Sequence, residues 1–560
     1  MAHAAERQPL LPPRALLAPV PPPRDLNHVS GAKLYWIFAV VWTTVFLGAL
    51  DSTIVATLQQ PIGDYFQQSH IASYIGTSYM LSGCCFTPLY GRLSDILGRK
   101  GAMLLALTIF TTGTLLCGIA PSMKALIAAR AIAGMGGGGI FTVSSIVATD
   151  LIPLRNRGLI QGVSNTIFGV GAGLGGPIGG YISDNFGWKY AFLVQVPFLV
   201  ASAILIAIHV NIILPEAPLT LNQKLKKIDW LGSLTLVLFV SSFLAGFSLK
   251  ATKDLAWGDT RVLGPISFSG LALSAFIFVE AKVSPAPVMP MRLLLSRTPL
   301  AVSLTNFFGS IVSFSILYNV PLYFMAVRLQ TASEAGQHLV PNAIALSLGS
   351  FGAGWIMQKT GKYWFLTVAS TSLSLLGSTL VALWDRKRTS EGEFWFDITF
   401  NGLGIASTVT STLIAITACV AREDMAVATG IMYLFRTTGQ VLGVSLSGTI
   451  FQAVLVAKLR ETMPGPDKNA IIEMIRHDAG LVRSLGGAQR EAAVSSFAQA
   501  LKVVFICQAS LAVLSVICAL PIEERPLPGS HEEHDEGHRR RENRNVITED
   551  NRDTGIRGST

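Results

Sequence analysis

Charged residues are scarce in this chain of 560 residues. Asp, Glu, Lys and Arg make up 14% of it, whereas a soluble globular protein carries about 25%. The composition therefore excludes an ordinary soluble domain, a disordered chain and a nucleic-acid-binding protein. The 43 Lys and Arg against 34 Asp and Glu give a net charge of +9, but the basic residues fall in the tails and short connectors and form no stripe. We expect no nucleic-acid partner.

Cysteine patterns, glycosylation sequons and metal-ligand motifs are also lacking. All six cysteines lie inside apolar runs, where cysteine behaves as a small buried hydrophobic residue and forms no disulfide framework or zinc site. The chain contains no Asn-x-Ser/Thr sequon, and the first 33 residues hold no apolar run that could act as a cleaved signal. The histidines of the tail sequence HEEHDEGH are interpreted as solvated. We expect no metal ion, no cofactor and no catalytic residue, so the protein is not an enzyme.

What the chain has instead is a series of apolar runs of about 18–25 residues, each long enough to cross a hydrocarbon core of about 30 Å as a helix. Strands are excluded, because an open sheet would leave backbone groups unpaired in lipid. The sequence therefore predicts an all-α integral membrane protein whose partner is the lipid bilayer. Fourteen transmembrane helices are predicted near residues 34–55, 71–90, 101–119, 124–148, 158–183, 190–213, 229–249, 262–281, 300–326, 338–357, 364–384, 397–420, 425–456 and 496–520.

The distribution of Lys and Arg predicts the orientation. An even number of crossings puts both ends on one side, and the connectors on that side carry more Lys and Arg, which marks it as cytosolic. The sequence thus predicts disordered cytosolic tails at 1–33 and 521–560, and a hydrophilic loop at 457–495 on the opposite face.

An internal repeat predicts the architecture. The segment from Gly91 has a second glycine, Gly98, seven residues on and then a cation, and the segment from Gly354 repeats this spacing with Gly361. If these connectors correspond, residues 34–213 and 300–520 form two six-helix bundles in parallel repeat, and the linker 214–299 carries an inserted pair. This 6+2+6 plan of two pseudo-symmetric bundles is that of a transporter with its substrate site between the halves.

At this point the sequence resembles the major facilitator superfamily. The segment GRLSDILGRK, residues 91–100, is similar to the signature loop of the family between helices 2 and 3. The resemblance implies that Gly91, Asp95, Gly98, Arg99 and Lys100 form a gating loop, in which the glycines allow close approach and the charged residues hold one conformational state. A positive-inside anchor is the simpler interpretation of the same residues.

Two ionisable residues lie deep in apolar stretches. Asp51 in LDSTIVATL and Arg130 in ALIAARAIAGMGGGGIF would each cost several kcal/mol if unpaired in lipid. They resemble the acidic first-helix motif and the arginine-containing helix-4 motif of the fourteen-span drug:proton antiporter group, which implies a role in proton coupling. We expect Asp51 to alternate between a proton and a substrate cation. The alternatives are an acid at the outer interface for Asp51, near the outer end of its predicted span, and a structural pairing for Arg130.

Helix 5 contains a glycine- and proline-rich stretch, GVGAGLGGPIGG. It resembles the motif of antiporters, which implies a hinge, but only one residue separates Gly-Pro from Gly-Gly where the familiar motif has two. The alternative is a kink with tight packing. The predicted hinge residues are Gly175, Gly176, Pro177, Gly179 and Gly180.

The second half supplies candidates for the wall of a substrate cavity. Arg436 lies inside the predicted span 425–456 beside Gln440, and an intramembrane cation needs a functional or structural reason. Asn306 is a third candidate, although an amide in a membrane helix more often links helices than contacts a ligand.

Segments such as GWKYAFLVQVPF and MYLFRTTGQVLGVSLSG are most similar to the fungal vacuolar basic amino acid transporters. In the N-terminal tail, Glu6, Leu10 and Leu11 fit the acidic dileucine pattern that adaptor complexes bind on proteins sorted to vacuoles. The resemblance implies a monomeric carrier of the vacuolar membrane that exchanges protons for small-molecule substrates, the basic amino acids Lys, Arg and His. The alternatives are a plasma-membrane multidrug:proton exporter and a transporter-like nutrient receptor.

Overall fold

The computed structural model describes most of the chain between residues 31 and 527. All regular structure in these parts is helical. The described ranges are 31–68, 74–210, 229–253, 258–284, 287, 289–330, 332–386, 388–421, 424–464, 471–472, 475, 482 and 485–527.

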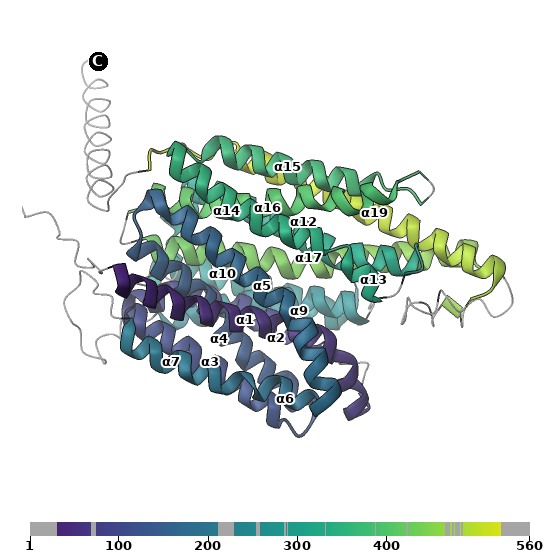
Figure 1. The fold of residues 1–560 in the computed structure, drawn as a ribbon, viewed down its shortest axis with the longest axis horizontal. Helices are drawn as coiled ribbons and strands as arrows, with labels where there is room; N and C mark the ends of the chain where they lie inside the picture. The colour runs from purple at the N-terminus through teal and green to yellow at the C-terminus, as the bar shows by residue number, and fades with distance from the viewer. Residues whose placement is uncertain are drawn as a thin grey trace, which may run out of the picture.

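The long helices fall into an N-terminal group and a C-terminal group with an inserted pair between them in the chain (Figure 1). The N-terminal group consists of α1 (Gly31–Phe66), α2 (Tyr74–Leu97), α3 (Arg99–Ile119), α4 (Met123–Leu151), α5 (Leu154–Phe186) and the broken span α6 (Trp188–Leu193) with α7 (Gln195–His209). The inserted pair is α9 (Trp230–Lys253) and α10 (Thr260–Phe278), followed by a π-helical turn, Val279–Val283, and α11 (Met291–Leu294). The C-terminal group consists of α12 (Arg297–Ala326), α13 (Ala332–Gln337), α14 (Val340–Thr360), α15 (Trp364–Ala382), α16 (Glu391–Cys419), α17 (Met425–Thr462) and α19 (Gly487–Ala519).

Twelve of the described helical segments are long and apolar enough to cross a membrane. The other two predicted spans correspond to α2 and α5, helices of 24 and 33 residues that are not among those twelve. Both helices are long enough to span about 30 Å, but their glycines and charged residues lower their mean hydropathy. The all-helical membrane fold is confirmed, and the count of fourteen crossings stays a prediction.

Three predicted boundaries change. Residues 457–462 and 487–495, assigned above to the hydrophilic loop, belong to α17 and α19. Helix α1 begins at Gly31 and continues to Phe66, so Asp51 lies well inside the helix and not near its outer end. Residues 521–527, assigned to the disordered tail, pack against the C-terminal bundle. Polar residues at the ends of these helices hid their true length, because hydropathy marks only the part that suits lipid.

The helices of the two bundles pack in the same pattern. In the N-terminal bundle α1 packs on α5, α2 on α4 and α3 on α4, and in the C-terminal bundle α12 packs on α17, α14 on α16 and α15 on α16. In Figure 1 the purple and blue N-terminal bundle lies below the green and yellow C-terminal bundle. The parallel repeat that the two glycine connectors predict is therefore present in the packing.

The two connectors also have equivalent geometry. Gly98 and Gly361 have positive φ angles of 83° and 68°, a conformation that favours glycine at a tight turn. The first glycine of each connector faces the other bundle: a Cβ on Gly91 would lie 2.9 Å from the carbonyl oxygen of Ala426 in α17, and one on Gly354 would lie 2.3 Å from that of Gly158 in α5. We call the end that carries these connectors the inner end.

The bundles touch along the inner half of α5 and α14 and separate toward the outer half. Gly162 of α5 lies against the backbone of Phe351, and the amide nitrogen of Asn165 donates a 2.6 Å hydrogen bond to Ser350. Further along the same stripe of α5, nothing lies within 4 Å of a Cβ on Gly173 or Gly180. The two bundles thus contact each other along the inner part of α5, and the outer part of this stripe of α5 is uncovered at Gly173 and Gly180.

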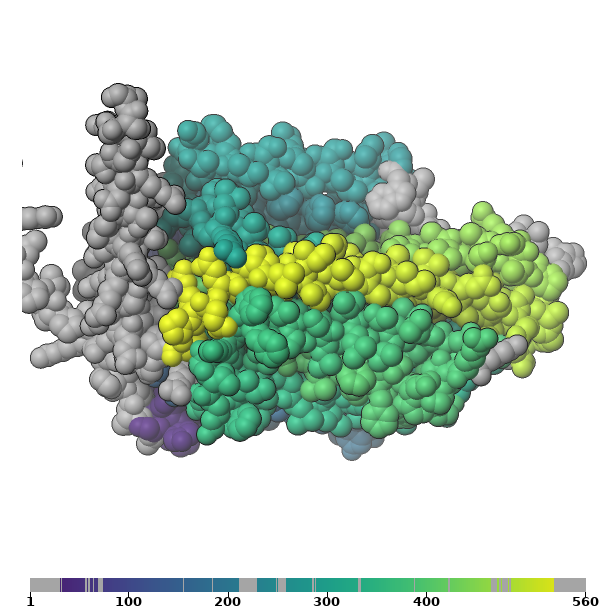
Figure 2. Space-filling view, turned by 90° about the horizontal axis from the view of Figure 1, so that it is seen from above, coloured from purple at the N-terminus to yellow at the C-terminus, as the bar shows by residue number. Residues whose placement is uncertain are grey.

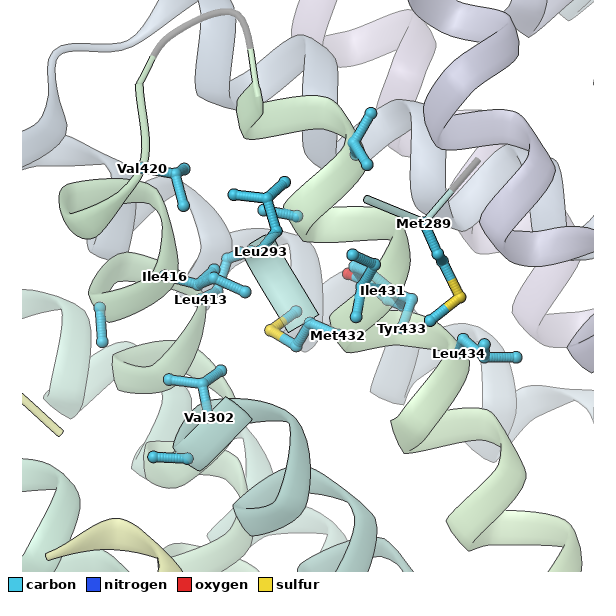
Figure 3. Close-up of a cluster of buried hydrophobic side chains, with 14 of the residues drawn as sticks. Met289, Leu293, Val302, Leu413, Ile416, Val420, Ile431, Met432, Tyr433 and Leu434 are labelled. Atoms are coloured by element: carbon cyan, nitrogen blue, oxygen red, sulfur yellow. The ribbon is translucent and has the colours of Figure 1, made fainter. Parts of the chain in front are cut away.

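The segment after the inserted pair is anchored in the C-terminal bundle. Met289 and Leu293 are buried in a hydrophobic cluster with Val302 of α12 and with Ile431 and Met432 of α17 (Figure 3). In the space-filling view, α19, in yellow, runs along the length of one face (Figure 2). Leu236, Val240 and Leu244 of α9 belong to the same cluster, so burial of apolar side chains ties the inserted pair as well as the segment after it to the second bundle.

The residues that follow α19 fasten the inner ends of two helices. The Glu524 carboxylate accepts hydrogen bonds from the backbone N–H groups of Tyr363 and Trp364, each at 2.9 Å, where α15 begins. The Arg525 guanidinium donates to the carbonyl of Cys419, the last residue of α16, at 3.1 Å. A carboxylate at a helix N-terminus is stabilised both by these donors and by the helix dipole.

We expect Glu524→Ala to destabilise the protein by about 1–2 kcal/mol, the usual cost of losing a helix cap. Its thermal unfolding midpoint in detergent should fall below that of the wild type. The matched control is Glu461→Ala, which removes an exposed carboxylate paired with Lys458 and should leave the midpoint unchanged. Equal midpoints for Glu524→Ala and the wild type would show that the segment contributes no stability.

Candidate functional site

An ion pair is enclosed in the N-terminal bundle. Nη1 of Arg130 in α4 donates to Oδ2 of Asp51 in α1 at 2.7 Å, and both side chains are 0% exposed. Both residues are predicted from the sequence to take part in proton coupling, and the structure brings them into direct contact. Each residue provides the partner that an intramembrane charge needs.

The surroundings of the pair are aromatic and leave several polar atoms unsatisfied. The guanidinium carbon of Arg130 lies 4.3 Å from the ring centroid of Tyr79 in α2 and 5.8 Å from that of Phe192 in α6. Four fully buried atoms have no hydrogen-bond partner among the described residues: Oδ1 of Asp51, Nε and Nη2 of Arg130, and the hydroxyl oxygen of Tyr79. Unsatisfied buried polar atoms cost free energy, so this pair is less stable than its short contact suggests.

Glycines set the positions of these side chains. A Cβ on Gly134 would lie 2.2 Å from the carbonyl oxygen of Tyr79, so only glycine lets α4 approach α2 this closely. Likewise a Cβ on Gly175 of α5 would lie 2.6 Å from the carbonyl oxygen of Leu50, the neighbour of Asp51. The glycine runs of α4 and α5 thus bring four helices, α1, α2, α4 and α5, together around the pair.

The location of the pair bears on the expected role of Asp51. In this conformation Asp51 is enclosed by side chains of its own bundle. Its contact with a substrate cation would need another conformation, and the alternation between proton and cation stays a prediction. Protonation of Asp51 would leave the Arg130 guanidinium buried without its counter-charge, which is strongly unfavourable.

At the two equivalent positions of the second bundle, both among the described residues, there is no ion pair. In the first bundle, Gly171 and Gly175 of α5 lie against the carbonyl oxygens of Phe46 and Leu50 in α1. In the second bundle, Gly439 and Gly443 of α17 lie in the same way against those of Phe307 and Ile311 in α12. Ile311 therefore corresponds to Leu50, and Val312 occupies the position that corresponds to Asp51. Gly134 and Gly136 of α4 make the same kind of helix contacts as Gly402 and Gly404 of α16. By the same argument, Ile398 occupies the position in the second bundle that corresponds to Arg130. Val312 and Ile398 are both fully buried. The ion pair is therefore specific to one half of the repeat.

At the inner end, a second charged cluster surrounds Arg99. Its guanidinium donates to Asp95 at 2.6 Å, to Asp150 at 2.5 Å and to Ser94 at 3.0 Å. Asp95 and Arg99 are thus brought together next to the closed contact of Gly91. Asp150, at the end of α4, was missed from the sequence because nothing in its local pattern distinguishes it from an ordinary helix-terminal acid. Lys100 is the second residue of α3, after Arg99, and is half-buried.

The predicted hinge lies in a continuous helix. Helix α5 runs through Pro177 without interruption, and the stretch differs from one end to the other in its packing. Gly175 is buried against α1, Gly179 is buried, Gly176 is half-buried, and nothing lies within 4 Å of a Cβ on Gly180. The stretch thus lies beyond the part of α5 whose glycines contact α14, and its bending remains a prediction.

The three residues of the second bundle that were predicted to line the substrate cavity differ in their burial. Arg436 and Gln440 are half-buried in α17. Asn306 is 1% exposed, and its amide nitrogen donates to the carbonyl of Val302 and to the hydroxyl of Thr412 in α16, each at 2.9 Å. This geometry favours an interhelical contact for Asn306 over a place in the cavity wall.

A polar contact between the bundles was not predicted. Besides Ser350, the amide nitrogen of Asn165 reaches the hydroxyl of Thr410 in α16 at 3.4 Å, and these two hydroxyls are 2.6 Å apart. Small polar residues are common in membrane helices, so sequence alone gave no reason to select these three. The proposed sorting residues Glu6, Leu10 and Leu11 lie outside the described residues.

Comparison with known proteins identifies the family. The family model described as the Major Facilitator Superfamily matches residues 41–453. The chain belongs to the major facilitator superfamily. This confirms the resemblance of the signature loop and makes the protein a multi-pass membrane transporter.

Several curated proteins are similar to this major facilitator. "Multidrug resistance protein fnx1" of Schizosaccharomyces pombe is 38% identical over 491 residues, 87% of this chain and 92% of that protein. "Vacuolar membrane amino acid uptake transporter fnx2" of the same organism is 35% identical, covering 90% of this chain and 86% of that protein. "Vacuolar basic amino acid transporter 2" of Saccharomyces cerevisiae is 31% identical, covering 80% of this chain and 97% of that protein.

A solved structure shares the fold. The proton:xylose symporter XylE aligns with a TM-score of 0.58 at 12% identity, covering 90% of this chain and 99% of that one. At this identity the likeness concerns the fold alone. It agrees with the two-bundle architecture of this major facilitator.

Proposed function

We propose that this transporter moves basic amino acids (Lys, Arg and His) from the cytosol into the vacuole in exchange for protons. The observation that carries the proposal is the enclosed ion pair of Asp51 and Arg130, whose stability depends on the charge of one carboxylate. Substrate would be bound between the bundles, which rock to expose it on either side in turn.

The ion pair links proton binding to conformation. With Asp51 ionised, Arg130 is paired and the N-terminal bundle is packed as observed. With Asp51 protonated, a buried guanidinium must find other acceptors or water, so the protonated bundle favours a different arrangement of α1 and α4. Polar atoms of Arg130 and Tyr79 are unsatisfied in the observed arrangement. They destabilise it and so lower the free energy needed to rearrange the bundle.

The inner closure fits a state open to the vacuolar lumen. With the N-terminus cytosolic, the contacts of Gly91 and Gly354 lie on the cytosolic side, and the uncovered outer half of α5 faces the lumen. In this state Arg436 and Gln440 would line the substrate cavity, and Asp95 and Arg99 would hold the gate shut. Opening the gate requires the two glycine contacts to separate.

The substrate class and the membrane rest on the similar proteins. Two of them carry names of vacuolar amino acid transporters, one of them for basic amino acids. The dileucine pattern of the N-terminal tail supports sorting to the same membrane through an adaptor complex. A vacuole with an acidic lumen would supply the protons that leave as substrate enters.

Uptake of labelled lysine into vacuolar vesicles that carry the protein tests this function. ATP-energised vesicles should accumulate lysine above vesicles without the protein, and a proton uncoupler should abolish the accumulation. Accumulation that is equal with and without the uncoupler would contradict proton coupling. No lysine uptake above the protein-free vesicles would contradict the substrate class.

Export of drugs from the plasma membrane is the second candidate. It is favoured by the 38% identity with the protein named for multidrug resistance. Localisation of a tagged chain separates the two functions, because export requires the plasma membrane. In that case bulky apolar compounds, and not lysine, should move against a proton gradient.

A further inference from the structure

We infer that Arg436 is the binding site for the carboxylate group of the substrate, so that the transporter accepts amino acids and rejects their decarboxylated or amidated counterparts. The inference rests on the proposed function and assigns one end of the substrate to one residue. It gives the carrier a requirement for an anionic group even though its substrates are cations overall.

Arg436 is a cation without a counter-charge. Among the described residues, no carboxylate forms an ion pair with it and no oxygen accepts a hydrogen bond from it. Its described neighbour is the ring of Tyr433, whose centroid lies 5.7 Å from the guanidinium carbon. Arg130, the other arginine deep in a span, has Asp51. A half-buried guanidinium with unused donors in a membrane helix has to face water or an anion, and such a site can take an anionic group of a ligand.

The contacts of α17 fix the direction of Arg436. Thr437 faces α2, because its hydroxyl lies 3.3 Å from Sγ of Cys84. Gly439 faces α12, because its Cβ position lies 2.4 Å from the carbonyl oxygen of Phe307. Successive helical residues turn by about 100°, so Arg436 points between these two faces, and Gln440, one turn further, shares its side.

The repeat places Arg436 at the depth where the bundles part. Gly171 and Gly439 occupy equivalent positions against the first helix of their bundles. Three residues before them stand Phe168 and Arg436, so the two residues correspond. Phe168 adjoins Gly169, the last glycine of the α5 stripe with a neighbour from α14, since Gly173 has none within 4 Å. Arg436 thus lies at the depth where the contact between the bundles ends, which would be the inner end of a cavity open to the outer side.

The chemistry of this position suits a carboxylate. A guanidinium offers paired N–H donors that match both oxygens of a carboxylate. The ion pair at Asp51 is enclosed in the other bundle and its charge is already balanced, so it does not compete for the substrate anion. Gln440 adds an amide that can donate to one of the oxygens.

Competition against labelled lysine uptake tests the inference in vacuolar vesicles carrying the full chain. Lysinamide has the shape and the ammonium groups of lysine, but a neutral amide replaces the carboxylate. Cadaverine is the decarboxylated counterpart of lysine and has neither a carboxylate nor an amide. Charged hydrogen bonds contribute about 1.5–3 kcal/mol, so unlabelled lysine should compete about tenfold to a hundredfold better than either compound. Equal competition by lysinamide and lysine would overturn the inference while leaving proton-coupled lysine transport intact.

Variants connect that selectivity to the residue. Arg436→Gln should raise the lysine concentration for half-maximal uptake about tenfold to a hundredfold, and Arg436→Lys should restore part of it because an ammonium still attracts the carboxylate. The matched control is Arg460→Gln, the same change at an exposed position of the same helix, which should leave uptake unchanged.

Protein levels and unfolding midpoints in detergent separate binding from folding. Arg436→Gln that keeps the selectivity of the wild type for lysine over lysinamide would overturn the inference. An absence of lysine uptake by the wild type would instead refute the proposed function, and the inference would fall with it.

Discussion

Asp51→Asn is expected to reduce proton-coupled uptake to the background of vesicles without the protein. Asparagine keeps the shape of the side chain but can neither carry the proton nor balance the charge of Arg130. Because both side chains are fully buried, the single change also leaves an uncompensated guanidinium, at a cost of about 3–5 kcal/mol. We therefore expect lower stability together with the loss of uptake.

The double variant Asp51→Asn with Arg130→Gln separates these two effects. It removes both charges, so the unfolding midpoint in detergent should recover most of what the single variant loses. Proton-coupled uptake should remain at background, because no carboxylate is present. Wild-type uptake by either variant would remove Asp51 from the mechanism.

The second large effect is expected from Gly354→Val. A Cβ at this position would lie 2.3 Å from the carbonyl oxygen of Gly158, so a larger side chain prevents the contact that closes the inner end. The variant should favour conformations open at the inner end and reduce lysine uptake at least about tenfold. Gly352→Val is the matched control, since nothing lies within 4 Å of a Cβ at that position of the same helix.

Labelling from the cytosolic side reports the open state directly. A cysteine placed at Ser350 of α14, which is buried where α14 meets α5 and α16, should react with a membrane-impermeant maleimide on intact vacuoles when Gly354→Val is present. In the Gly352→Val background it should react no faster than in the otherwise unchanged protein. All three proteins carry the cysteine at position 350 and have their six native cysteines replaced. Equal labelling of the Gly354→Val, Gly352→Val and otherwise unchanged proteins would show that the Gly158–Gly354 contact does not close the inner end.

The sequence predicted the parts of the fold that depend on lipid. Long apolar runs located the helices, and the spacing of Gly91 with Gly98 and of Gly354 with Gly361 predicted a repeat that the packing confirms. It did not predict where helices end in water, as α17 and α19 show, because hydropathy does not detect polar helical turns. It also failed to foresee that residues 521–525 fasten the inner ends of the C-terminal bundle.

The candidate site was less predictable than the fold. The free-energy cost of a charge inside an apolar run marked Asp51, Arg130 and Arg436, and the first two also resemble motifs of the family. The free-energy cost of a buried charge does not predict which charges pair, because pairing depends on which helix faces meet. It therefore did not predict that Asp51 and Arg130 pair inside one bundle while Arg436 has no charged partner among the described residues. Asp150 and Tyr79 gave no signal at all: an acid at a helix end and an aromatic residue in a span are common in any membrane protein.

Proton movement driven by substrate is the most direct test of coupled exchange. Purified protein in liposomes with an enclosed pH-sensitive dye, at equal pH on both sides, should make the interior alkaline when lysine is added outside, because each entering lysine drives protons out. The Asp51→Asn, Arg130→Gln liposomes should show no such change. Uptake of labelled lysine by the wild type with no change in internal pH would contradict the account.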